Sequence, residues 1–388
     1  IGYFYSIQGF VSIIMPALMG IVADRWMQAQ KVLSLCHFLA GGAIIAASLY
    51  CIQDSDNVDF STLFGLYSIS VAFFMPTIAL TNSVSYNALD KAGLDAVKTF
   101  PPIRVFGTVG FIVSMWIVDL SGWQTTSLQF LWSGILSVIL ALYSLTMPKC
   151  ETNANKSTGN IAQALGLEAF KLFKNYRMAL FFIFSMLLGC CLQITNGYAG
   201  PFLQSFGINE IYQGTFGVEH SNILISLSQM SETLCILLIP FCLSRFGIKK
   251  VMLMSMLAWA LRFGFFAIGN PGDGVWLLIL SMIVYGIAFD FFNISGSLFV
   301  DKETDISIRN SAQGVFMMMT NGFGASLGMI VAGWVMNMYT VNENGLMIDK
   351  AGTGGWQEAW TIFAVYALVV AIMFALLFRY KHVTEKTN

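Results

Sequence analysis

The chain has 388 residues, of which 56% are hydrophobic and only 11% are charged, and its mean hydropathy is +0.70. This balance lies far outside that of a soluble globular protein, so the composition predicts an integral membrane protein. No polar stretch is long enough to form a soluble domain, which excludes a single-span receptor, and the net charge of −1 is uninformative without the positions of the charges.

Apolar runs of the length needed to cross a bilayer predict eleven helices. Five of them precede a polar stretch, at 2–23, 31–52, 62–85, 103–121 and 126–147. Six follow it, at 177–203, 220–243, 248–268, 275–300, 312–338 and 357–379. The polar stretch is expected to hold a short surface helix at 161–173, because apolar residues recur there at helical spacing beside two lysines.

These runs predict an all-α membrane protein in three parts. Residues 1–147 would form an N-terminal bundle, 148–176 a cytoplasmic linker, and 177–388 a C-terminal bundle with a short tail. Five and six spans form an uneven pair for a duplicated protein. The simplest explanation is that one N-terminal span is absent from this sequence, so that the helices correspond to helices 2–12 of two six-helix bundles.

Basic residues alternate between the two sets of connections. Nearly all Lys and Arg of the connections fall in one set, which ends with Arg379, Lys381 and Lys386 in the tail, whereas the opposite set holds only Lys350. Because short connections rich in Lys and Arg stay on the cytoplasmic side, this pattern places the C-terminus in the cytoplasm.

Four charged side chains fall inside predicted spans, namely Arg104, Glu232, Arg262 and Asp290. A charge at the bilayer centre costs about 2.5–3.5 kcal/mol on insertion scales, so each requires an explanation. Arg262 lies near the non-cytoplasmic end of its span, where its side chain can extend to the lipid headgroups. Glu232 lies near mid-bilayer. A titrating acid inside the membrane is what proton coupling requires, so Glu232, Asp290 or both are expected to carry the coupling proton.

Amides and aromatic rings accompany these charges on several helices. They are Gln193, Asn196, Gln229, Tyr285, Phe289, Asn293 and, beside Arg104 on one helix face, Thr108 and Phe111. Amides suit ribose hydroxyls and base edges, and aromatic faces stack on a base, so the set indicates a neutral, polar, aromatic ligand. Taken one at a time, each amide is equally well explained as a bridge between helices. Gly324, Gly328 and Gly333 predict a small-residue face for close helix packing.

Several sequence strings resemble one family of membrane carriers. GIVADRW at 20–26 resembles the loop signature of the major facilitator superfamily, with Gly20, Asp24 and Arg25 as its expected conformational residues. The more specific strings are FPPIRVFGTVGF at 100–111, FFIFSMLLGCCLQITN at 181–196, SQMSETL at 228–234, SRFGIKK at 244–250 and IVYGIAFDFFNISGS at 283–297. They resemble the nucleoside:proton symporter family of that superfamily, and the likeness covers essentially the whole chain.

The resemblance implies the major facilitator fold and proton-coupled uptake of nucleosides by alternating access. It implies purine and pyrimidine substrates such as uridine, cytidine and adenosine, a monomer in the bacterial inner membrane, no cofactor or metal besides the coupling proton, and no nucleic-acid partner. The family's nucleoside-contacting positions fall on Arg104, Thr108, Phe111, Gln193, Asn196, Gln229, Glu232, Tyr285, Phe289 and Asp290.

Alternatives to this interpretation include a related carrier and an enzyme. A major facilitator for sugars or another small polar solute, or a facilitator without proton coupling, would have a similar sequence pattern. An enzyme is disfavoured, because His37, His220 and His382 are scattered and no nucleophile, base and orienting group can be proposed.

Overall fold

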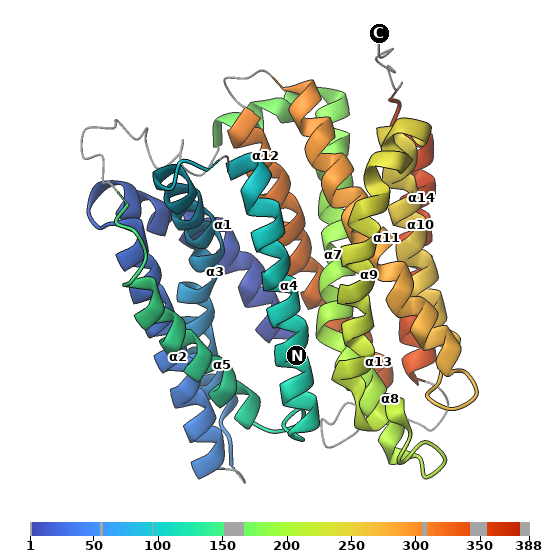
Figure 1. The fold of residues 1–388 in the computed structure, drawn as a ribbon. Coiled ribbons are helices and arrows are strands. Elements are labelled where there is room, and N and C mark those ends of the chain that lie inside the picture. The colour runs from blue at the N-terminus through green and yellow to red at the C-terminus, as the bar shows by residue number, and fades with distance from the viewer. Residues whose placement is uncertain are drawn as a thin grey trace. The chain divides into compact units, whose positions relative to one another are not determined.

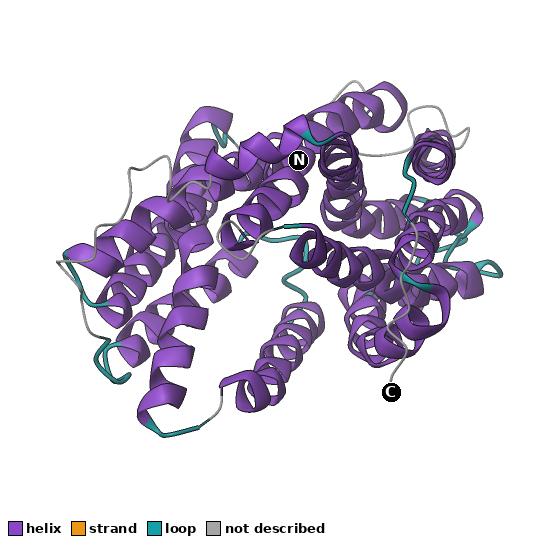
Figure 2. Cartoon of the chain, turned by 90° about the horizontal axis from the view of Figure 1, so that it is seen from above, coloured by secondary structure: helices purple, strands orange, loops and turns teal. Residues whose placement is uncertain are grey.

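The computed structural model describes residues 2–54, 57–94, 96–150, 167–304, 309–341 and 355–380. Within these ranges every element of regular secondary structure is a helix (Figure 2). The chain divides into two compact units, one of Ile7–Leu167 and the other of Ile1–Ser6 with Glu168–Asn388. The prediction of two bundles joined by a linker at 148–176 is not tested by this division and stays a prediction.

Five helices, coloured blue to teal in Figure 1, cover the N-terminal part of the chain. They are α1 (Gly2–Arg25), α2 (Ala29–Gln53), α3 (Phe60–Lys91), α4 (Ala96–Leu120) and α5 (Leu128–Ser144). In the unit of Ile7–Leu167, α2 packs against α3 and α5. Ser34 donates to the carbonyl of Ala141 at 2.7 Å, and a Cβ on Gly41 would lie 2.9 Å from the carbonyl oxygen of Gly134. Small residues thus bring the backbones of α2 and α5 close together.

The other unit contains the helices that follow in the chain. They are α7 (Tyr176–Ser205), α8 (Phe216–Glu219), α9 (Ser221–Phe246), α10 (Ile248–Ile268), α11 (Val275–Glu303), α12 (Arg309–Met317), the π-helix η3 (Met318–Gly324), α13 (Ala325–Thr340) and α14 (Gly355–Leu377), with the 3-10 turns η1 (Leu167–Lys174) and η2 (Phe206–Ile208). Helix α10 packs against α11 and α14, and α9 packs against α11. Aromatic side chains such as Phe181, Trp259 and Trp360 are fully buried in its core.

The described helices match the predicted spans closely. Nine of them are long and apolar enough to cross a membrane, and two shorter apolar helices occupy Val105–Leu120 and Leu128–Ser144. Each predicted span corresponds to one of these elements, with boundaries that differ by a few residues. The prediction of an all-α membrane protein is therefore confirmed. The span predicted at 312–338 differs in one respect, because the π-helix η3 interrupts it between α12 and α13.

Glycines allow α7 to approach η3 and α13 closely. A Cβ on Gly189 would lie 2.1 Å from the carbonyl oxygen of Thr320, and one on Gly324 would lie 2.3 Å from that of Met186. A Cβ on Gly328 would lie 2.5 Å from the Cβ of Cys190. The predicted small-residue face of this span is therefore used for packing, and its partner is α7.

Two predicted features lie partly outside the described residues. Of the predicted surface helix, only Leu167–Lys174 is described, and it forms the 3-10 turn η1. In the predicted conformational loop, a Cβ on Gly20 would meet nothing within 4 Å, and the side chains of Asp24 and Arg25 lie outside the described residues. Both assignments stay predictions.

Candidate functional site

A close approach of α9 and α11 brings the two predicted acids near each other. A Cβ on Gly286 would lie 2.6 Å from the carbonyl oxygen of Ser231, so only a glycine fits at this crossing. The hydroxyl of Ser231 donates to the carbonyl of Ile283 across the same contact. Glu232 follows Ser231 on α9, and Asp290 lies one turn beyond Gly286 on α11. The crossing therefore positions both carboxyl groups at one level of the unit.

The two carboxyl groups differ in burial. Asp290 is only 5% exposed, and its Oδ2 has no hydrogen-bond partner among the described residues. Glu232 is half-buried and lies within electrostatic range of Asp290. A buried carboxylate with an unpaired oxygen costs considerable free energy, whereas a protonated carboxyl group is neutral and costs less. A pair of this kind is suited to binding and releasing a proton.

Tyr285 lies at the centre of the aromatic groups beside the acids. Its side chain is 4% exposed and lies within electrostatic range of Glu232 and Asp290 and close to Gln229 of α9. Its ring stacks with that of Phe289 at a centroid distance of 6.0 Å and an interplanar angle of 15°. Five of the ten predicted binding residues, Gln229, Glu232, Tyr285, Phe289 and Asp290, are thus gathered on α9 and α11.

The position of Arg262 in the structure contradicts the prediction that its side chain extends to the lipid headgroups. The side chain is 1% exposed, and its guanidinium donates to the carbonyl of Ser281 at 2.6 Å. It also donates to the hydroxyls of Thr195 and Ser228, each at 3.4 Å. Hydroxyls and a carbonyl from three neighbouring helices replace water around the charge, and this allows it to remain inside the unit.

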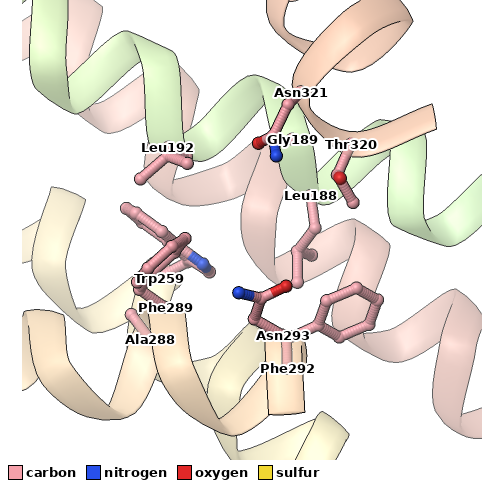
Figure 3. Close-up of a pocket in the computed structure, with 10 residues that line it drawn as sticks. All are labelled: Leu188, Gly189, Leu192, Trp259, Ala288, Phe289, Phe292, Asn293, Thr320 and Asn321. Atoms are coloured by element: carbon pink, nitrogen blue, oxygen red, sulfur yellow. The ribbon is translucent and has the colours of Figure 1, made fainter. Parts of the chain in front are cut away.

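A small pocket of about 30 Å³ lies next to this cluster (Figure 3). It is lined by Leu188, Gly189, Leu192, Trp259, Ala288, Phe289, Phe292, Asn293, Thr320 and Asn321. In Figure 3 the amides of Asn293 on α11 and Asn321 on η3 point toward the space beside Trp259 and Phe289. Ligand pockets usually measure about 300–1,000 Å³, so this one can form only part of the wall of a nucleoside-sized site.

Trp259, Asn293, Thr320 and Asn321 were absent from the residues predicted to bind the ligand, although the structure places them on this wall. Asn293 was noted as an amide beside Asp290, three residues away on the same helix, but it was not included among the predicted binding residues. Thr320 and Asn321 belong to the π-helix, a local geometry that apolar periodicity does not indicate. π-Helical turns occur frequently at functional sites.

The other predicted residues are not brought to the acids by any described contact. On α7, Gln193 is half-buried and Asn196 is exposed, and neither lines the pocket. On α4 of the other unit, Thr108 is half-buried and Phe111 is 54% exposed. The side chain of Arg104 lies outside the described residues. Their predicted roles, like those of the five gathered residues, stay predictions.

Comparison with solved structures identifies the fold class of this protein. A bacterial homologue of the human lysosomal transporter Spinster superposes with a TM-score of 0.66 over 97% of this chain and 89% of that chain, at 13% sequence identity. At this identity the match shows the fold alone, and it confirms the predicted fold of the major facilitator superfamily. The chain is a multi-pass membrane protein of that architecture.

A family model and relatives of higher sequence identity show the protein family to which the chain belongs. The family model described as nucleoside H⁺ symporter matches residues 1–383, so the chain belongs to that family. It is 50% identical to the xanthosine permease of Escherichia coli K12 over 387 residues, covering 100% of this chain and 89% of the relative. It is 48% identical over 389 residues to the nucleoside permease NupG of the same organism, with the same coverage. A crystal structure of a NupG mutant matches with a TM-score of 0.90 and 48% identity over 97% of this chain and 90% of that chain.

Proposed function

We propose that this protein takes up nucleosides together with protons across the bacterial inner membrane by alternating access. The observation that carries the proposal is the pair formed by the buried Asp290 and the half-buried Glu232 beside Tyr285, in a chain of the nucleoside H⁺ symporter family. An ionised acid inside a membrane protein is costly in free energy unless it binds an ion or a ligand. Two neighbouring acids can also pass a proton from one to the other inside the protein.

The proposed roles follow from the chemistry of each group. Tyr285 and Phe289 are stacked aromatic side chains that offer a face to a nucleobase. The amides of Gln193, Asn196 and Gln229 suit ribose hydroxyls and base edges, and Glu232 can accept hydrogen bonds from either. Arg104, Thr108 and Phe111 of α4 are also proposed to contact the nucleoside, as the family resemblance implies. Glu232, Asp290 or both would carry the proton.

Finer features are proposed on the same basis. The named relatives are a xanthosine permease and a nucleoside permease, which supports a substrate range including purine and pyrimidine nucleosides such as uridine, cytidine and adenosine. We propose that the protein works as a monomer in the lipid bilayer, uses no cofactor besides the coupling proton, and has its C-terminus in the cytoplasm. The alternation of basic residues supports the orientation.

Uptake into proteoliposomes tests the function and the coupling acids together. The wild-type protein should accumulate labelled uridine when a pH gradient is imposed, and unlabelled nucleosides should compete where free sugars do not. Glu232→Gln and Asp290→Asn remove one ionisable group each at nearly constant volume. At least one of the two should reduce accumulation to simple equilibration, because no proton then accompanies the substrate.

Exchange of labelled for unlabelled uridine without a pH gradient separates coupling from binding. A variant that has lost only the coupling proton should still exchange. If both single variants accumulated uridine like the wild type, the assignment of the coupling acids would be wrong. If sugars competed as well as nucleosides, the alternative of a sugar carrier would replace the proposed substrate class.

A further inference from the structure

Arg262 is a fully buried cation with a role that the proposed transport cycle does not yet include. Its hydrogen-bond acceptors in the described part of the chain are neutral, namely the hydroxyls of Thr195 and Ser228, the carbonyl of Ser281 and the sulfur of Met282. Burial of a guanidinium is costly unless opposite charge lies nearby. The groups packed against the guanidinium must therefore compensate for its loss of water.

Aromatic rings cover the guanidinium. The ring centroid of Tyr285 lies 4.6 Å from its central carbon, and that of Phe266 lies 5.1 Å away. Both distances are within the range of a cation–π interaction, which is strongest where water is excluded. The ring of Tyr285 also stacks with Phe289 and meets Trp259 edge to face at 5.9 Å. The cation therefore contributes to fixing one aromatic ring of the proposed binding site.

Tyr285 also connects Arg262 to the acid pair. The same phenol lies within electrostatic range of Arg262, Glu232 and Asp290, and close to Gln229. One cation and two carboxyl groups thus surround a single side chain. Tyr285 is thus the side chain through which Arg262 is connected to the acid pair.

We propose that Arg262 is a positioning residue for nucleoside binding, which fixes the ring of Tyr285 beside the Glu232 and Asp290 pair through a cation–π contact. The inference rests on the proposed function, since it assigns a part in the same site. It differs from a purely structural role for Arg262 because it requires a positive charge at this position, and not only a side chain of the right length.

Two substitutions separate charge from shape. Arg262→Met keeps an unbranched side chain and removes the charge, whereas Arg262→Lys keeps the charge and loses the fork of donors. We expect uridine to bind the Met variant about tenfold more weakly, because a desolvated cation–π contact is lost, and the Lys variant to recover part of this loss. Binding is measured by calorimetry on purified protein in detergent, and accumulation in proteoliposomes.

Ser255→Ala is the matched control. Ser255 donates to the carbonyl of Ala288, so this variant also removes a buried link between α10 and α11, and that link involves neither Tyr285 nor Arg262. It should bind uridine like the wild type. Should the Met variant fail to fold, Thr195→Val removes one acceptor of the guanidinium and keeps the charge in place. It should weaken binding by about threefold, as loss of one hydrogen bond to a charged group allows.

The outcomes separate this inference from the proposed function. Uridine binding by a folded Met variant at wild-type strength would overturn the inference, and so would a Lys variant that binds no better than the Met variant. Where only Thr195→Val can be purified, unchanged binding by that variant would overturn it. Failure of the wild-type protein to bind any nucleoside would overturn the proposed function, and the inference with it.

Discussion

Arg262 and Asp290 are both buried ionisable residues, but their surroundings differ. Arg262 is surrounded by acceptors and aromatic faces from four helices, so its charge is stabilised by the fold. Asp290 has one buried oxygen without a partner among the described residues. A group with satisfied hydrogen bonds contributes to a fixed structure, whereas an unsatisfied one gains most from a proton or a ligand. This difference favours Asp290 as a group that changes state during transport.

A cap at the start of α3 allows a test of pH dependence outside the apolar span. The carboxylate of Asp59 accepts from the backbone N–H of Thr62 at 2.8 Å and from its hydroxyl at 2.9 Å. These hydrogen bonds lower the pKa of Asp59 below its usual value of 3.8. Because the pKa is lowered on folding, the carboxylate contributes its stability in full above that value and loses it as the pH falls through the lowered pKa.

We therefore expect Asp59→Ala to lower the temperature of thermal unfolding at neutral pH, since the first turn of α3 loses its acceptor. The difference from the wild type should shrink below the usual pKa of 3.8, where the wild-type cap also weakens. Light-scattering or fluorescence melts of the purified protein at neutral and acidic pH measure both effects. Asp59→Asn keeps an acceptor and serves as the control. Equal unfolding temperatures of wild type and Asp59→Ala at neutral pH would show that the cap contributes nothing.

At the scale of elements, the contact of α7 with η3 depends on the absence of side chains. The backbone of the π-helix passes directly over Gly189, so the carbonyl of Thr320 occupies the space that any Cβ would need. The sulfur of Cys190 also donates to the carbonyl of Gly324 at 3.2 Å in the same contact. Because this contact carries one wall of the pocket, the position of Thr320 and Asn321 depends on it.

Gly189→Ala should destabilise the protein strongly, because the new methyl group would lie 2.1 Å from a backbone oxygen that cannot rotate away. Overpacking typically costs about 1–3 kcal/mol, and occasionally more. Gel filtration after heating, with a fluorescent tag, should show a lower melting temperature. Gly264→Ala on α10 is the control, since its Cβ would meet nothing within 4 Å. If both variants melted like the wild type, η3 would be able to move away from α7 at little cost.

At the scale of the whole molecule, the charges of the connections predict how the chain is oriented in the membrane. The connections rich in Lys and Arg are those that would face the cytoplasm, including the one that contains Arg245, Lys249 and Lys250. The orientation does not depend on any detail of helix packing, since it is set while the chain is inserted.

A green fluorescent protein fused after Asn388 should fluoresce in intact bacteria, because that fusion folds in the cytoplasm. Alkaline phosphatase fused at the same point should be inactive, and fused between α10 and α11, near Asp273, it should be active. The opposite pattern of the two reporters would contradict the proposed orientation of the C-terminus.

The positions of the helices and the class of protein could be predicted from the sequence alone. About 20 apolar residues are needed to cross a bilayer, and this is a local property that each segment displays by itself. Family strings such as SQMSETL and IVYGIAFDFFNISGS also lie within single helices, and they indicated the nucleoside H⁺ symporters before any contact was known. The acids Glu232 and Asp290 could be selected because burial of a charge in lipid is costly wherever the helix lies.

Only the tertiary structure decided how each helix is turned and what surrounds its polar groups. The sequence assigned Arg262 to the headgroups, whereas Thr195, Ser228 and Ser281 from three other helices bury it. The π-helix and the pocket residues Asn293 and Asn321 were likewise decided by packing. The physical reason is that hydropathy reports the transfer of one segment from water to lipid, while the partners of a buried side chain depend on several segments at once.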